Sequence, residues 1–122
     1  MIKFDGMEKS MTFEELQVWQ FARGIVLKVY GLTALIKDYG YNDQIQRAAI
    51  SVMNNIAEGY ESGSSPVLKR YFLIAKGSCG EVRSMLYAGI DLGYVVKEQG
   101  EELIDECRHL ASMIRKFIDN RR

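Results

Sequence analysis

The chain has 122 residues and 48% hydrophobic content, which suits one domain with one packed core and excludes a two-domain protein. Sixteen Lys and Arg balance sixteen Asp and Glu, so no global charge draws the protein onto nucleic acid or an anionic membrane, and any such binding needs a local patch. With two cysteines and no secretory signal pattern, the expected location is the cytoplasm. No apolar run approaches the roughly 18 residues of a membrane span.

The first helix is predicted over residues 13–38. Thr12 and Glu15 have the spacing of a capping box, which satisfies backbone amides at a helix start. Residues 1–11 show no sustained hydrophobic period, and we expect them to form a flexible leader before a bundle over residues 12–122. Within the first helix, apolar residues recur in steps of four and three, which places them on one face: Val18, Ala22, Ile25, Val29, Leu32 and Ile36.

Three more helices are predicted, over residues 43–61, 66–92 and 98–119. Asn42 is the expected cap of the second helix, and Ser65 before proline is the expected cap of the third. Their apolar seams include Ile45, Ala49, Val52 and Ile56, then Leu68, Phe72, Ala75, Cys79, Val82, Leu86 and Gly89, then Leu103, Cys107, Leu110, Ile114 and Phe117. The predicted fold class is therefore all-α, an antiparallel up-and-down four-helix bundle with neighbouring helices crossing at roughly 20°.

Large apolar side chains also lie off these seams. One interpretation is a wide core stripe with tyrosines at its margins. The other is a subunit interface, because aromatic residues are enriched where protein surfaces associate. The residues assigned to such an interface are Trp19, Phe21, Tyr30, Tyr71 and Tyr87.

The sequence offers no reactive constellation. His109 is the single histidine, and Asp105 one turn earlier favours a surface ion pair over catalysis. Cys79 and Cys107 occupy seam positions, where thiols behave as small hydrophobic groups. We therefore predict no catalytic residue, no metal site and no cofactor.

Glu58 and Glu81 stand beside seams, where a carboxylate is expected to be partly buried. Their expected role is structural, through hydrogen bonds to Arg47, Asn55 or a neighbouring helix. A hydrolase or metal site built on the two carboxylates is the alternative, although the Glu-x-x-His pattern of di-iron bundles is missing. Gly77 with Gly80 predicts close helix packing rather than a phosphate loop.

Basic residues are unevenly placed despite the neutral total. If the first and third helices present them on one side, an oligomer repeats the patch and gains phosphate affinity through several weak contacts. A merely solvated helix face is the alternative. The residues assigned to phosphate contacts are Arg23, Lys28, Lys69, Arg70, Lys76 and Arg83.

Several motifs resemble one family. The run from Gln44 to Val52, Gln-Ile-Gln-Arg-Ala-Ala-Ile-Ser-Val, leads into Asn-Ile-Ala-Glu-Gly at Asn55 to Gly59, and Ala-x-Gly-Ser with Gly77 follows some eighteen residues later. Further matches are Phe13, Leu16, Val18-Trp19, Phe72-Leu73-Ile74-Ala75, Glu81 and Leu92-Gly93-Tyr94. The chain resembles small bacterial four-helix-bundle proteins encoded by intervening sequences of large-subunit ribosomal RNA genes, often labelled ribosomal proteins. It is also similar to accessory variability proteins of diversity-generating retroelements.

The resemblance implies the four-helix fold but no settled activity, because the intervening-sequence members have none. The retroelement accessory proteins assemble as a pentameric barrel and bind nucleic acid and a reverse transcriptase through a basic surface. By that likeness we expect a non-enzymatic, ring-like homo-oligomer, a pentamer, which serves as an adaptor for RNA, DNA, a reverse-transcriptase-like partner or a ribosomal partner, and has no membrane partner. The alternatives are a protein-binding scaffold without nucleic-acid binding, and an enzyme that uses Glu58 and Glu81.

Overall fold

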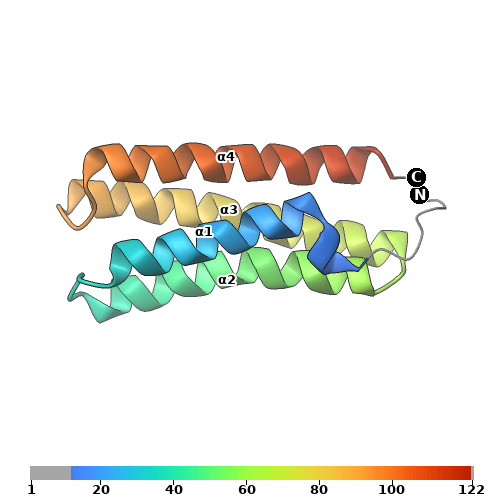
Figure 1. Ribbon diagram of the computed structural model, residues 1–122, viewed down its shortest axis with the longest axis horizontal. Helices are drawn as coiled ribbons and strands as arrows, with labels where there is room; N and C mark the ends of the chain where they lie inside the picture. The colour runs from blue at the N-terminus through green and yellow to red at the C-terminus, as the bar shows by residue number, and fades with distance from the viewer. Residues whose placement is uncertain (1–11, 122) are drawn as a thin grey trace.

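The computed structural model describes residues 12–121, which form long helices that run antiparallel to their neighbours in sequence (Figure 1). The 3₁₀ turn η1 (Phe13–Glu15) precedes α1 (Gln17–Thr33). It is followed by α2 (Tyr39–Glu61), α3 (Ser65–Asp91) and α4 (Lys97–Asp119). The predicted all-α four-helix fold is confirmed, and the described part of the chain holds no strand. The leader predicted over residues 1–11 lies outside the described residues.

The helices form a square in which the backbone of each lies beside two others. α1 packs against α2 and α4, and α3 packs against the same two helices, whereas the backbones of the diagonal pairs, α1 with α3 and α2 with α4, stay apart. The α2–α3 pair is the most extensive and the α1–α4 pair the least. This arrangement decides which surface residues can share a site.

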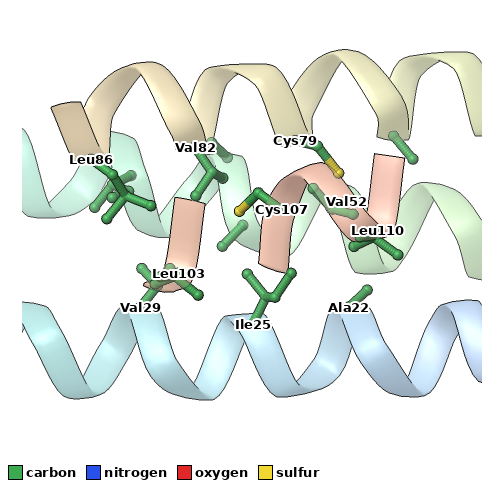
Figure 2. Close-up of a cluster of buried hydrophobic side chains, with 14 of the residues drawn as sticks. Ala22, Ile25, Val29, Val52, Cys79, Val82, Leu86, Leu103, Cys107 and Leu110 are labelled. Carbon is green, nitrogen blue, oxygen red and sulfur yellow. The ribbon is translucent and has the colours of Figure 1, made fainter. Parts of the chain in front are cut away.

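The predicted seams form the core. Figure 2 shows side chains from all four helices converging between them, with Ala22, Ile25 and Val29 of α1 facing residues such as Leu110. Leu32 is only partly buried, at the edge of the same cluster. Along the described chain, no helix is sufficiently long and apolar to cross a bilayer. Among the largest fully buried side chains are Ile25, Val29, Ile45, Val52, Ile56, Phe72, Val82, Leu86, Ile104, Leu110 and Ile114.

The first helix is shorter at both ends than predicted. The capping box is present, with the Thr12 amide donating to Glu15 Oε1 at 3.2 Å, but it caps only the 3₁₀ turn. Leu16 then takes an extended conformation and buries its side chain, so α1 begins one residue later. At the other end, the Thr33 hydroxyl donates to the Val29 carbonyl at 2.9 Å, and α1 ends there rather than at residue 38.

Two predicted caps are wrong. Asp38, not Asn42, caps α2, because its carboxylate accepts from the Tyr41 amide at 3.0 Å, so α2 begins four residues earlier than predicted. Asn42 is instead buried and donates to the Ile36 carbonyl at 2.8 Å. Ser64, not Ser65, caps α3 by accepting from the Val67 amide at 3.4 Å. The predicted end of α3 near Gly93 holds, since this glycine adopts φ 78°, the left-handed conformation that terminates helices.

The close approach of α2 and α3 depends on two glycines. A Cβ on Gly59 of α2 would lie 3.2 Å from the Leu68 carbonyl oxygen and 3.0 Å from Tyr71 Cβ, both on α3. On α3, a Cβ on Gly89 would overlap the Tyr41 hydroxyl, which donates to the Met85 carbonyl at 2.6 Å. Between these two points, the hydroxyls of Ser51 and Ser78 hydrogen-bond at 2.9 Å across the interface. The two helices therefore pack more closely than side chains at these positions would allow.

Replacing Gly89 with Ala should lower the free energy of unfolding by about 1–3 kcal/mol, because the new methyl displaces Tyr41 and Val95. Gly77 is the matched control on the same helix, since it is exposed and an added Cβ meets nothing within 4 Å. Gly77→Ala should raise that free energy by about 0.5–1 kcal/mol through helix propensity. Urea unfolding followed by circular dichroism measures both values. Equal changes in the two variants would contradict this account of the α2–α3 contact.

Candidate nucleic-acid interface

Basic residues recur every seven positions along α3. Lys69, Lys76 and Arg83 lie on one side of the helix, because seven residues make almost two full turns. None of these side chains forms an ion pair or hydrogen bond with residues 12–121. We call these three residues the α3 basic row. Its charge is therefore uncompensated within the described chain.

The α3 basic row faces the junction of α3 with α4. The positive charge of Arg83 acts on the thiol of Cys107 in α4 as well as on that of Cys79 in its own helix. Arg83 Nε is buried and has no hydrogen-bond partner within residues 12–121, so a ligand outside the bundle would meet the terminal nitrogens of this guanidinium rather than Nε.

Two arginines of α4 lie beside the same junction, and they are also seven residues apart. Arg108 donates to Asp105 at 3.0 Å and, through its other terminal nitrogen, to the Tyr87 hydroxyl of α3 at 2.9 Å. Arg115 forms an ion pair with Asp119 at 3.6 Å. Near Arg115 the surface holds a groove of about 420 Å³ between α3 and α4, which we call the α3–α4 groove. It is lined by Lys69, Leu73, Arg115, Ile118, Asp119 and Arg121.

The sequence analysis did not assign these two α4 arginines to the interface. A search for basic residues at seven-residue intervals would have found Arg108 and Arg115 as well as the α3 basic row. The position of α4 beside α3, which brings the two sets together, comes from the fold.

The predicted patch shared by the first and third helices is wrong, because α1 and α3 lie diagonally opposite each other in the bundle. Lys28 of α1 forms an ion pair with Glu106 of α4 at 2.5 Å. Arg23 stacks over the Trp19 ring at 5.6 Å. Arg70 lies on α3 over the Tyr71 ring at 5.8 Å, but one position after Lys69, and so points about 100° away from the α3 basic row.

The aromatic residues assigned to a subunit interface divide into two groups. Trp19 packs edge-on against Phe13, Phe21 packs against His109, and both are partly buried on the core, as the wide-core interpretation predicts. Tyr71 is also partly buried. Only Tyr30 and Tyr87, with 42% and 47% of their surface exposed, are available to a partner.

The two acids of the family motifs do not have the structural roles predicted for them. The carboxylates of Glu58 and Glu81 are exposed and form no hydrogen bond within residues 12–121, because both lie on outward faces of their helices. Arg47 pairs with Asp43 at 2.8 Å instead. Asn55 is structural, since its amide donates to the Ser51 carbonyl one turn earlier at 2.8 Å.

The predicted packing of Gly77 and Gly80 against another helix is also wrong within residues 12–121. A Cβ on either residue would meet no atom of these residues within 4 Å, because both glycines face outward from α3. Among the described residues, no group of three His, Cys, Asp or Glu side chains is placed to hold a metal ion.

The comparison with protein families gives the assignment. Residues 14–116 match the model of the 23S rRNA-intervening sequence protein. The chain belongs to this family. No curated protein is a match.

A solved structure with the same fold is a protein of unknown function from the S23 ribosomal protein family of Bacteroides thetaiotaomicron VPI-5482. It is 20% identical, covers 83% of this chain and 97% of its own, and superimposes with a TM-score of 0.78. At that identity the likeness supports the four-helix fold of the intervening-sequence family and nothing more specific. The resemblance to retroelement accessory proteins remains an expectation.

Burial raises the pKa of Cys79 and Cys107 from the ordinary value of 9.0 to about 12. Both thiols are 1% exposed, so iodoacetamide at pH 8 should label them only after unfolding. Because the unfolded thiols ionise near pH 9 and the folded ones near 12, the free energy of unfolding should fall as the pH rises between these values. Mass spectrometry of native and urea-treated protein checks the labelling, and rapid native labelling would refute the buried positions.

Proposed function

We propose that this member of the intervening-sequence family is a non-enzymatic homo-oligomeric adaptor in the cytoplasm that binds nucleic acid. The α3 basic row carries the proposal, because its cations have no acidic partner in the described chain although the protein as a whole is neutral. Contacts from such a row reach phosphates and carry no base specificity. The family is named for intervening sequences of 23S rRNA and not for a ligand, and RNA is the nucleic acid that we propose to test first.

A single row of three cations binds phosphate weakly, and assembly of several copies would strengthen it. The outward side of α1 supports self-association, since Leu27 is 68% exposed and Tyr30 lies one turn further on. Gly24 and Gly31 flank them, and an added Cβ at either position meets no atom of the described residues within 4 Å. We call these four residues the α1 apolar face. A second copy of the chain could approach this face closely, as helices do at small residues.

The family resemblance supports a pentamer as the assembly, and a reverse-transcriptase-like or ribosomal protein as a further partner.

The α1 apolar face also favours the second candidate function, a protein-binding scaffold without nucleic-acid contacts. The two functions differ in one observable. Proteins bound directly to a scaffold remain bound after nuclease treatment, whereas proteins recruited through RNA are released.

Fluorescence anisotropy measures binding to labelled structured RNA and duplex DNA. The logarithm of the association constant should fall linearly with the logarithm of the salt concentration. Replacing Lys69 and Lys76 together with Gln should lower RNA affinity at least tenfold at 0.1 M salt, since about 0.7–0.9 of a counterion is released for each phosphate contact. Lys37→Gln with Lys97→Gln, at exposed positions away from the row, is the charge-matched control. If the wild-type protein fails to bind any nucleic acid even at low salt, the scaffold replaces the adaptor.

Leu27→Glu should dissociate the oligomer, because it places a charge in the centre of the α1 apolar face. Sedimentation velocity at micromolar concentration measures the assembled mass. Leu92→Glu, at a residue 59% exposed after α3, is the control and should leave the mass unchanged. A wild-type monomer, or an unchanged mass for Leu27→Glu, would refute this interface.

A further inference from the structure

We propose that single-stranded nucleic acid lies along the junction of α3 and α4, where Arg108 and Arg115 bind phosphates together with the α3 basic row. These residues of both helices are the α3–α4 strip. The inference rests on the proposed nucleic-acid binding and adds to it the location of the strand and the two α4 residues.

Contacts between the two helices place the α4 arginines beside the row. The Arg108 guanidinium reaches Tyr87 across the junction at 2.9 Å, and Arg115 shares the α3–α4 groove with Lys69. Since α3 and α4 run antiparallel, Arg108 lies toward the C-terminal end of α3, beside Tyr87, and Arg115 lies toward its N-terminal end, near Lys69. Lys69 and Arg83 are separated by fourteen residues, which corresponds to about 21 Å along a helix.

The cations of the α3–α4 strip can accept new partners at little cost. Those of the α3 basic row form no ion pair with residues 12–121. Asp105 and Asp119, which pair with the α4 arginines, have side chains 74% and 64% exposed. Ion pairs of this exposure contribute little to stability, so a phosphate can replace the carboxylate as the partner of each arginine at little cost in free energy.

The shape of the α3–α4 strip favours a single strand over a duplex. A straight row of charges can follow one extended backbone, whereas a duplex backbone winds away after a few phosphates. Tyr87, 47% exposed beside the strip, offers an aromatic ring on which a base can stack, and Leu73, 45% exposed, adds apolar surface next to it. At about 3.4 Å per nucleotide of a stacked strand, the length between Lys69 and Arg83 accommodates about six nucleotides.

Anisotropy with a labelled six- to twelve-nucleotide RNA of unstructured sequence tests the inference on the full chain. The double variant Arg108→Gln with Arg115→Gln removes two phosphate contacts. It should lower affinity about 25-fold at 0.1 M salt and reduce the log–log salt slope by about 1.4. Lys97→Gln with Lys116→Gln makes the same charge change at exposed positions of the same helix, and should change affinity less than twofold. Helical circular dichroism and the melting temperature establish that each variant is folded.

The outcomes separate the two proposals. Loss of binding in the arginine variant, with the control unaffected, supports the α3–α4 strip. If the wild-type protein binds RNA but the arginine variant binds equally well, the strip is wrong and the proposed function stands. Tighter binding of a duplex than of the single strand of equal length overturns the single-strand assignment. A wild-type protein that binds no nucleic acid overturns the proposed function and the strip together.

Discussion

The close packing of α2 against α3 is the constraint on which the rest of the bundle depends. Gly59 lets α2 approach the backbone of α3, Gly89 leaves room for the Tyr41 side chain of α2, and the hydroxyls of Ser51 and Ser78 meet at 2.9 Å between them. Because α3 is held on one side by α2 and on another by α4, its rotation is fixed. The apolar seam from Leu68 to Gly89 faces inward, and the opposite side is left to the solvent.

The fixed rotation of α3 determines which of its side chains are exposed and in which direction they point. With its seam buried, α3 must present the α3 basic row toward the edge it shares with α4, and leave Gly77 and Gly80 facing outward. The motifs shared with the intervening-sequence family therefore separate by role. Asn55 and Gly59 act inside the bundle, whereas the carboxylates of Glu58 and Glu81 are exposed and form no hydrogen bond or ion pair with the described residues. The exposed side of α3, rather than an internal pocket, is where binding is proposed.

Periodicity was sufficient to predict the helices and the core, because burial imposes a regular spacing on apolar residues such as Ile25 and Phe72. Helix ends were predicted less well, since Asp38 and Asn42 are both good caps and only tertiary packing decides between them. The candidate site was predicted in part. The sequence shows that Lys69 is basic, but not that α1 lies diagonally from α3 or that α4 adds its arginines.

The central claim is that the α3–α4 edge is the nucleic-acid surface of this family member. Photo-crosslinking of the wild-type protein to an RNA that carries 4-thiouridine, followed by mass spectrometry of the adducts, tests it most directly. The account predicts crosslinks in residues 69–87 and 108–115, around the exposed ring of Tyr87. Crosslinks confined to α1, near Arg23 and Lys28, would contradict it.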